Sequence, residues 1–213
     1  MRFILIGAPG AGKGTQAERL SGYLKIPRIT TGDLFRQAVQ DQTPLGKKVQ
    51  DILEKGSLVP DAVVLELMAE RMSKPDSEAG FILDGFPRTL GQAEGLESWF
   101  KRQNEKLDAV IALDVSKEEA IRRITGRRQC GRCGSTYHLD FQPPKKTGVC
   151  DSCGGALKQR GDDQESVVLH RLEVYAEQTA PLISFYEGRG LLKRVDGSQE
   201  VAKVFNEICS LIK

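Results

Sequence analysis

Short apolar segments alternate along the chain with longer stretches in which apolar residues recur at helical spacing. The segments Arg2 to Gly7 and Asp108 to Val115 are almost continuously apolar and bounded by polar residues, which predicts buried strands. Between them, Lys13 to Leu24 has the spacing of an amphipathic helix. Further short strands are predicted at Ile26 to Thr30, Phe81 to Leu83 and Leu191 to Val195.

Helix start signals separate these strands. Pro60 precedes a helical pattern over Asp61 to Met72. Thr89 and Ser116 are each followed three residues later by Gln or Glu, which predicts capping boxes. The helices predicted with these and later signals cover Thr89 to Arg102, Ser116 to Ile124, Glu165 to Glu187 with a kink at Pro181, and the C-terminus from about Ser198.

Strands that alternate with helices indicate an α/β fold with a parallel sheet, in which ligands bind at the carboxyl ends of the strands. Two stretches interrupt the alternation. Thr31 to Val59 is helical without a strand, and Gly126 to Asp163 is rich in Gly, Cys, Arg and Lys. We expect both to project from a core, which divides the chain into core segments 1–29, 60–125 and 164–213 and insertions 30–59 and 126–163.

A glycine-rich loop follows the first strand and precedes the first helix. Its sequence, Gly-Ala-Pro-Gly-Ala-Gly-Lys-Gly-Thr over residues 7–15, predicts a phosphate-binding loop, because glycines let backbone amides approach phosphate oxygens. Lys13 would act on the β- and γ-phosphates, and Thr15 would place a hydroxyl near Mg²⁺. The residues predicted to bind ATP here are Gly10, Ala11, Gly12, Lys13, Gly14 and Thr15.

A second candidate site lies where the strand at Phe81 to Leu83 ends in Asp84. A carboxylate at the end of a buried strand beside a phosphate-binding loop is the usual neighbour of Mg²⁺. A plain Asp-Gly turn is the alternative explanation of Asp84, and a surface position is the alternative for Arg88.

Four of the five cysteines form two pairs, Cys130-x₂-Cys133 and Cys150-x₂-Cys153, with sixteen residues between them. This spacing predicts a structural zinc site with four thiolate ligands, which needs no contribution from His138. Metal binding would supply folding energy to a segment with few apolar residues. Unmetallated thiols or two disulfides are the alternatives, although the odd cysteine count argues against a disulfide framework.

The composition of the chain excludes few classes of function. The formal net charge is +2, from 31 basic and 29 acidic residues, and 39% of the 213 residues are hydrophobic. The chain has no apolar run of membrane-spanning length and no signal-peptide layout, so we expect a cytoplasmic protein. Arginines are concentrated over residues 122–132 without an acidic residue. They indicate either a solvated basic face, nucleic-acid binding, or charge neutralisation during phosphoryl transfer.

Two motifs carry a family resemblance. Asp84-Gly-Phe-Pro-Arg-Thr89 and Thr30-Thr-Gly-Asp-Leu-Phe-Arg36 resemble the signatures of adenylate kinases, and the glycine between Lys13 and Thr15 is similar to that of nucleoside monophosphate kinases. The order and spacing match the long-lid form over the whole chain. The resemblance implies a P-loop three-layer fold with a helical AMP-binding insertion and a zinc-ribbon lid. It also implies reversible phosphoryl transfer from Mg·ATP to AMP, giving two ADP, in a monomer.

The resemblance also implies roles for single residues. Those implied to bind AMP are Thr31, Arg36, Ser57, Leu58, Val59, Gly85, Phe86, Pro87, Arg88, Gln92, Arg160 and Arg171. Those implied to act in catalysis are Lys13, Asp84, Arg88, Arg123, Arg127, Arg160 and Arg171. Arg127, Thr136, Tyr137 and Gln199 would contact ATP, and Asp162 and Asp163 would hold the closed lid through ion pairs. An amide can pair with the adenine edge, but Gln92 also fits the capping box.

Two rival functions stay open at this point. A kinase acting on UMP or CMP would share the glycine loop and the Asp84 motif, although Thr31 and the long lid favour AMP. A zinc-ribbon nucleic-acid-binding NTPase would need an extended basic surface with aromatics spaced for base stacking. Tyr137 and Phe141 are the only aromatic residues of the cysteine insertion, and the net charge is small.

Overall fold

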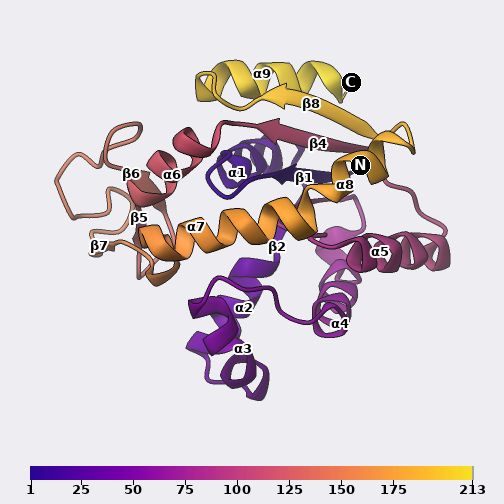
Figure 1. Cartoon of the computed structure of the whole chain (residues 1–213), viewed down its shortest axis with the longest axis horizontal. Coiled ribbons are helices and arrows are strands. Elements are labelled where there is room, and N and C mark those ends of the chain that lie inside the picture. The colour runs from indigo at the N-terminus through magenta and orange to yellow at the C-terminus, as the bar shows by residue number, and fades with distance from the viewer. Residues whose placement is uncertain (213) are drawn as a thin grey trace.

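Five parallel strands form the central sheet of the computed structural model, which describes residues 1–212 (Figure 1). The strand order is β2-β3-β1-β4-β8. The strands are β1 (Arg2–Gly7), β2 (Arg28–Thr30), β3 (Phe81–Asp84), β4 (Ala109–Asp114) and β8 (Leu192–Asp196). All five predicted strands are confirmed; the bounds of β1 agree, and the ends of the other four differ from the prediction by at most two residues. Because the strands are parallel, the carboxyl ends of β1, β2 and β3 meet at one edge, where Gly7, Thr30 and Asp84 lie.

Each face of the sheet is buried by a different set of helices, because side chains alternate between the faces along a strand. Phe3 and Leu5 of β1 pack with α1 and α9, whereas Ile4 and Ile6 pack in the cluster that contains α4, α5 and α8. The helices around the sheet are α1 (Lys13–Leu24), α4 (Asp61–Met72), α5 (Leu90–Gln103), α6 (Lys117–Thr125), α8 (Pro181–Glu187) and α9 (Val201–Leu211), with a short 3₁₀ turn at Pro75–Ser77. None of the helices within residues 1–212 has the length and apolar character needed to span a bilayer.

The predicted N-caps are confirmed at two helices. The Thr89 hydroxyl accepts a hydrogen bond of 3.1 Å from the Gln92 amide, and the Ser116 hydroxyl accepts one of 3.2 Å from the Glu119 amide. These bonds satisfy amides that the first helical turn leaves unpaired. The Gln92 side chain does not return to the cap residue, because its Oε1 accepts from the Arg88 amide at 2.8 Å.

The long helix predicted over 165–187 is interrupted before Pro181. It consists of α7 (Glu165–Val174), a π-helical turn at Tyr175–Thr179 and α8. The Ala180 amide donates to the Tyr175 carbonyl at 2.8 Å, five residues back, so the turn is wider than an α-helical one. Pro181 begins the following helix, where a missing N–H costs nothing.

The two insertions project from the core at different places (Figure 1). The first contains the paired helices α2 (Thr31–Gln40) and α3 (Pro44–Glu54). The second contains a small antiparallel sheet of order β6-β5-β7, with strands β5 (Arg127–Cys130), β6 (Thr136–His138) and β7 (Leu157–Lys158). A 3₁₀ turn at Gly161–Asp163 leads from this sheet into α7, which begins two residues later at Glu165.

Candidate active site at the carboxyl edge of the sheet

The glycine loop connects β1 to α1, as predicted from the sequence. The Lys13 ammonium group donates to the carbonyl oxygens of Gly7 and Ala8, at 2.7 and 2.9 Å, and so lies across the loop. Burial lowers the pKa of Lys13 to about 8; the Asp84 carboxylate opposes this shift, and the charges of Arg88, Arg171 and Arg127 add to it. The ammonium group is therefore poorly compensated, as expected of a group that binds an anion.

Two glycines of the loop lie close to neighbouring residues, and at Gly10 the packing leaves no room for a side chain. At Gly10 the backbone is left-handed, with φ of +86°, and a Cβ atom would lie 2.4 Å from the carbonyl oxygen of Ala120 in α6. At Gly14 a Cβ atom would lie 3.2 Å from a guanidinium nitrogen of Arg28 and 3.5 Å from the Asp84 carboxylate. The glycine that separates Lys13 from Thr15 thus lets the loop pass directly over Asp84.

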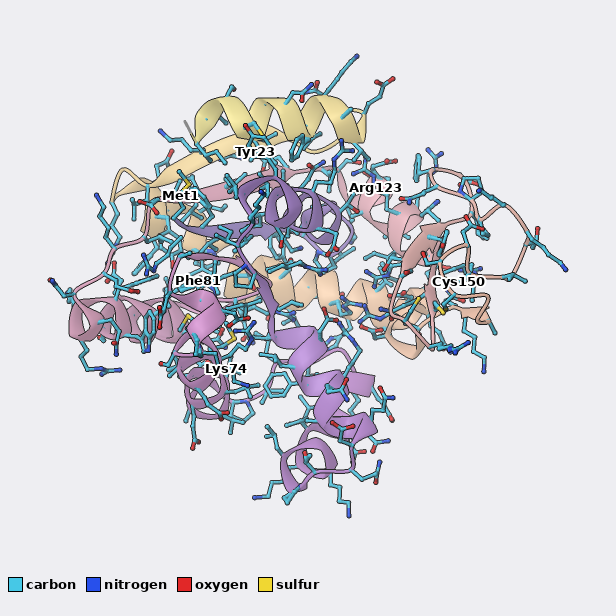
Figure 2. All side chains as sticks on the ribbon, turned by 180° about the vertical axis from the view of Figure 1, so that it is seen from behind. Met1, Tyr23, Lys74, Phe81, Arg123 and Cys150 are labelled. Atoms are coloured by element: carbon cyan, nitrogen blue, oxygen red, sulfur yellow. The ribbon has the colours of Figure 1, made fainter. Side chains whose placement is uncertain are left out.

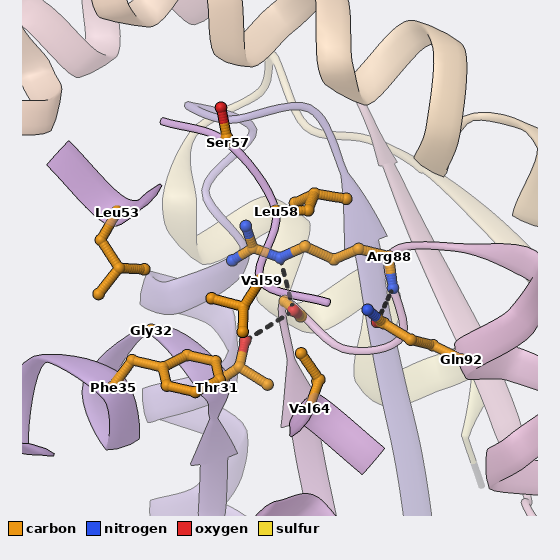
Figure 3. Close-up of a pocket in the computed structure, with 11 residues that line it drawn as sticks. Thr31, Gly32, Phe35, Leu53, Ser57, Leu58, Val59, Val64, Arg88 and Gln92 are labelled. Carbon is orange, nitrogen blue, oxygen red and sulfur yellow. Dashed lines mark hydrogen bonds between the residues drawn. The ribbon is translucent and has the colours of Figure 1, made fainter. Parts of the chain in front are cut away.

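A cavity of about 330 Å³ opens between the first insertion and the sheet (Figure 3). The Gly85 carbonyl at its centre accepts from the Thr31 hydroxyl at 3.0 Å and from Arg88 Nε at 2.7 Å. The lining residues are Thr31, Gly32, Phe35, Leu53, Ser57, Leu58, Val59, Val64, Gly85, Arg88 and Gln92. Most residues implied to bind AMP are among them. The exceptions include Arg36, which forms an ion pair with Asp33, and Phe86, whose side chain is fully buried in the core.

Gln92 is held in place at the wall of this cavity. Its Nε2 donates to Asp61 Oδ1 at 2.8 Å, while its Oε1 accepts from the Arg88 amide. An amide side chain has two donor hydrogens and an acceptor with two lone pairs, so one of each remains for a ligand. The cap position and the predicted adenine contact are therefore compatible.

A second cavity, of about 540 Å³, lies beside the glycine loop. Its lining includes Gly7, Pro9, Lys13, Pro87, Arg171 and Thr179. Leu58, Gly85 and Arg88 line both cavities, so the Arg88 side chain stands where they meet. A phosphate on each side of Arg88 would lie within reach of its guanidinium group, which can fork onto phosphate oxygens.

Arginines from the core and from the second insertion converge on this place. Burial lowers the pKa of Arg171 to about 10; Asp162 opposes this shift, and the charges of Arg127, Arg160 and Arg88 add to it. Burial also lowers the pKa of Arg88 and of Arg160, and the charge of Arg36 lowers both further. Mutual repulsion among guanidinium groups is relieved by polyanions, so the arrangement suits phosphoryl groups.

Two carboxylates compensate part of this charge. Arg160 forks onto Asp162, with Nε 2.9 Å from Oδ1 and Nη2 2.7 Å from Oδ2. Arg171 Nη1 also contacts Asp162 Oδ2, at 2.9 Å. Arg127 forks onto the fully buried Asp163, with Nε 2.8 Å from Oδ2. Asp162 and Asp163 therefore form ion pairs as predicted, and the contacts of Arg171 with both carboxylates connect the second insertion to α7.

Arg123 lies at the rim of the glycine loop, away from these pairs. Its guanidinium nitrogens donate to the carbonyl oxygens of Gly197 and Ser198, at 2.8 and 3.4 Å, and a Cβ at Gly12 would lie 3.9 Å from Nη1. The neighbouring Gln199 is exposed and lies 3.5 Å from Glu207. Gly12, Arg123 and the segment before α9 thus come together, as a nucleotide-binding role on this side requires.

The four paired cysteines form one cluster in the second insertion (Figure 2). Their sulfur atoms all lie within 4.8 Å of one another, with Cys130 Sγ 3.5 Å from Cys153 Sγ and Cys133 Sγ 3.6 Å from Cys150 Sγ. A tetrahedral zinc ion with Zn–S bonds of about 2.3 Å separates its sulfurs by about 3.8 Å. The donor set and spacing therefore fit a metal ion.

Tyr137 belongs to the surroundings of this cluster. Thr136 is exposed and Tyr137 is buried, because alternate side chains of β6 point to opposite faces. The Tyr137 hydroxyl lies 3.6 Å from Cys150 Sγ and accepts from the Asp151 amide at 2.9 Å. The family resemblance implies an ATP contact for Tyr137, and the structure places its side chain inside the insertion.

Comparison with known proteins agrees with this geometry. The sequence profile of the adenylate kinase family matches residues 5–191. An adenylate kinase of Moorella thermoacetica is 52% identical over 204 residues, which cover 96% of this chain and 94% of the relative. An adenylate kinase of Archaeoglobus fulgidus is 51% identical over 213 residues, covering 100% of this chain and 98% of the relative.

The chain belongs to the adenylate kinase family. Enzymes of this family transfer a phosphoryl group between ATP and AMP, with Mg²⁺ bound to ATP. A two-substrate reaction explains why two cavities meet at Arg88. We call the cysteine-containing insertion, residues 126–163, the lid.

Several residues of this adenylate kinase site are not evident from the sequence. Arg28 contacts Asp84, Asp61 holds Gln92 and Thr89, and the Thr179 hydroxyl donates to the Arg88 carbonyl at 2.8 Å. Each partner lies at least 28 residues away in the chain. The one local signal in the sequence that points to any of these residues is that Arg28, a charged residue, lies within the short strand β2.

Proposed function

We propose that this chain transfers the γ-phosphoryl group of Mg·ATP to AMP, with ATP on the side of the glycine loop and AMP in the cavity between α2 and β3. The observation that supports this assignment is that Arg88 lines both cavities. Lys13 and Arg88 then lie on opposite sides of the transferred group. Positioning and positive charge supply most of the catalysis in such a reaction.

The attacking group needs no general base in this mechanism, because the phosphate oxygens of AMP are already anionic. Arg88, Arg160 and Arg171 orient the acceptor phosphate and neutralise the charge that spreads over the transferred group. Lys13, Arg123 and Arg127 do the same from the donor side. The remaining donor and acceptor of Gln92 face the adenine of AMP.

Asp84 and Thr15 are the residues that would hold Mg²⁺, since carboxylate and hydroxyl oxygens are the ligands this ion prefers. Asp84 Oδ2 accepts both hydrogen bonds from Arg28, and Oδ1 has no hydrogen-bond partner within residues 1–212. A bound Mg²⁺ ion would neutralise part of the charge of the phosphates.

We propose zinc as the metal of the cysteine cluster. Four thiolates leave no open position for water, so the metal would be structural. Zinc binds the thiolate form of cysteine, and a bound zinc ion would itself stabilise that form in its ligands.

We also propose that segments 30–59 and 126–163 close over AMP and ATP as separate units on a core of 1–29, 60–125 and 164–213. Closure would exclude water and so suppress hydrolysis of ATP. We further propose that the protein acts as a monomer in the cytoplasm. Sedimentation with and without nucleotide would test the monomer, and cell fractionation the location.

The decisive experiment is a coupled assay of acceptors. AMP, CMP, UMP and GMP are compared at fixed Mg·ATP, and kcat/KM for AMP should exceed the others by a wide margin. A Gln92→Glu variant should lose activity with AMP, because a carboxylate has no hydrogen to donate to adenine. Equal or better activity with CMP or UMP would overturn the assignment of AMP.

A further inference from the structure

An arginine contacts one of the two oxygens of the carboxylate that the proposed function assigns to Mg²⁺. Arg28 of β2 directs Nε and Nη2 at the same oxygen of Asp84, at 3.1 and 2.8 Å from Oδ2. The contact follows from the sheet, in which β2 and β3 are parallel neighbours with Thr30 beside Asp84. The Asp84 side chain is 8% exposed and that of Arg28 is 26% exposed. The pair is therefore shielded from solvent mainly on the side of Asp84.

The pair lies directly against the glycine loop. The hydrogen of Gly14 points toward Arg28 Nη2 and Asp84 Oδ2, since a Cβ there would approach them to 3.2 and 3.5 Å. Lys13 and Thr15 flank this glycine in the chain. A group bound by the loop and by Asp84 would therefore lie beside the Arg28 guanidinium.

Arg28 has other anionic neighbours on its outer side. Its Nη1 lies 3.4 Å from Glu18 Oε2, and its Nη2 lies 3.9 Å from Asp33 Oδ2. An arginine guanidinium stays charged in proteins. Glu18 and Asp33 therefore remain to compensate it when Asp84 binds another cation.

We propose that Arg28 is a positioning residue that holds Asp84 Oδ2 beneath the glycine loop and competes with the divalent cation for this carboxylate. The proposal rests on the proposed function, because it assumes that Asp84 faces the metal of Mg·ATP. Arg28 makes the site less selective for the metal-bearing nucleotide over the metal-free one. Its positive charge compensates Asp84 while nucleotides exchange.

The proposed competition predicts in which direction the preference for metal-bearing nucleotide changes when Arg28 is replaced. Two cations that share one carboxylate repel each other, so removal of the Arg28 charge should favour the metal. By linkage, the change appears in the ratio of the dissociation constants of metal-free and metal-bearing nucleotide. An ion pair with one partly exposed partner contributes little, so we expect a factor of about five.

The test is calorimetric titration of the full-length protein with a non-hydrolysable ATP analogue, with and without Mg²⁺. Arg28→Gln should raise the preference for the Mg²⁺-bearing analogue about fivefold. Arg28→Lys, which keeps the charge and loses the fork, should stay within about twofold of the wild type. Arg71→Gln is the matched control, because Arg71 forks onto Asp76 far from the loop, at 2.9 and 2.8 Å.

Asp84→Asn separates the inference from the proposed function on which it rests. If Asp84→Asn lowers the preference for the Mg²⁺-bearing analogue while Arg28→Gln leaves it unchanged, competition by Arg28 is overturned and the role of Asp84 stands. If Asp84→Asn leaves the preference unchanged, the proposed role of Asp84 is overturned as well. An Arg28→Lys variant that behaves like Arg28→Gln would also contradict competition by charge.

Discussion

The Thr179 hydroxyl donates a hydrogen bond of 2.8 Å to the backbone carbonyl oxygen of Arg88, which lies 91 residues earlier in the chain. Thr179 is the last residue of the π-helical turn between α7 and α8, and it is buried. The turn therefore supports the backbone of the residue that stands between the two cavities. An irregular helix here has a structural use, because a regular one would place residue 179 differently.

Thr179→Val tests this support. The variant keeps the shape of the side chain but leaves the Arg88 carbonyl unpaired, which costs about 1–2 kcal/mol. For a chain of this length we expect the melting temperature to fall by about 3–6 °C. We also expect kcat to fall about tenfold, because Arg88 loses its fixed position. Thr179→Ser should restore both values, and a variant with normal kcat would show that the bond serves stability alone.

The pKa of Lys13, lowered to about 8, predicts a specific pH dependence. The ammonium form binds phosphate, so kcat/KM for ATP should be constant below about pH 8 and fall above it. Bound phosphates raise this pKa again, so kcat should persist to higher pH. Steady-state assays from pH 6.5 to 10 measure the pH dependence of both kcat/KM and kcat.

Variants of Lys13 provide the control for this profile. Lys13→Ala should lower kcat by about 10²–10³, because a charge aimed at the transferred group is lost. Lys13→Arg keeps a charge that does not titrate in this range, so its residual kcat/KM should not fall above about pH 8. If kcat/KM of Lys13→Arg falls there as in the wild type, another group is responsible for the titration.

The core of this fold can be predicted from the sequence because its signals are local. The bounds of β1 and α1 agree with the prediction, since an apolar run, a glycine loop and a helical pattern follow one another directly. The four cysteines are also brought together as their spacing predicts. Here short-range chemistry determines the structure, with little need for distant contacts.

Contacts between distant segments cannot be predicted in this way. The π-helical turn brings Thr179 to the Arg88 carbonyl, and no periodicity in the sequence marks this turn. Arg28 meets Asp84 only because β2 and β3 are neighbours in the sheet. Tyr137 is buried because its face of β6 turns toward the cysteines. The sequence of the adjacent pair Thr136-Tyr137 does not show which of the two residues lies on that face.

Removal of the metal should loosen the lid before the core. The lid has a small apolar cluster formed by Cys130, Cys150 and Tyr137, with Cys153 and Leu157 against it, so the proposed metal would supply much of its folding energy. Hydrogen exchange of the full-length protein after treatment with a chelator should accelerate over 127–158 first. Exchange in α2 and α3 should change little and serves as the internal control. An unchanged melting temperature in chelator would contradict a structural metal.

The buried fork between Arg127 and Asp163 should be the most sensitive of the lid ion pairs. Asp163 is fully buried and also lies 3.6 Å from Arg171, so Asp163→Asn leaves Arg127 without its partner and removes one of the two carboxylates beside Arg171, which keeps Asp162. We expect the free energy of unfolding in urea to fall by about 3 kcal/mol. The control is Asp76→Asn, whose side chain is 55% exposed and which should cost less than about 1 kcal/mol. Because a bound triphosphate supplies the missing negative charge, an ATP analogue should stabilise Asp163→Asn more than the wild type. Equal stabilisation of both proteins would show that Arg127 and Arg171 do not face the phosphates.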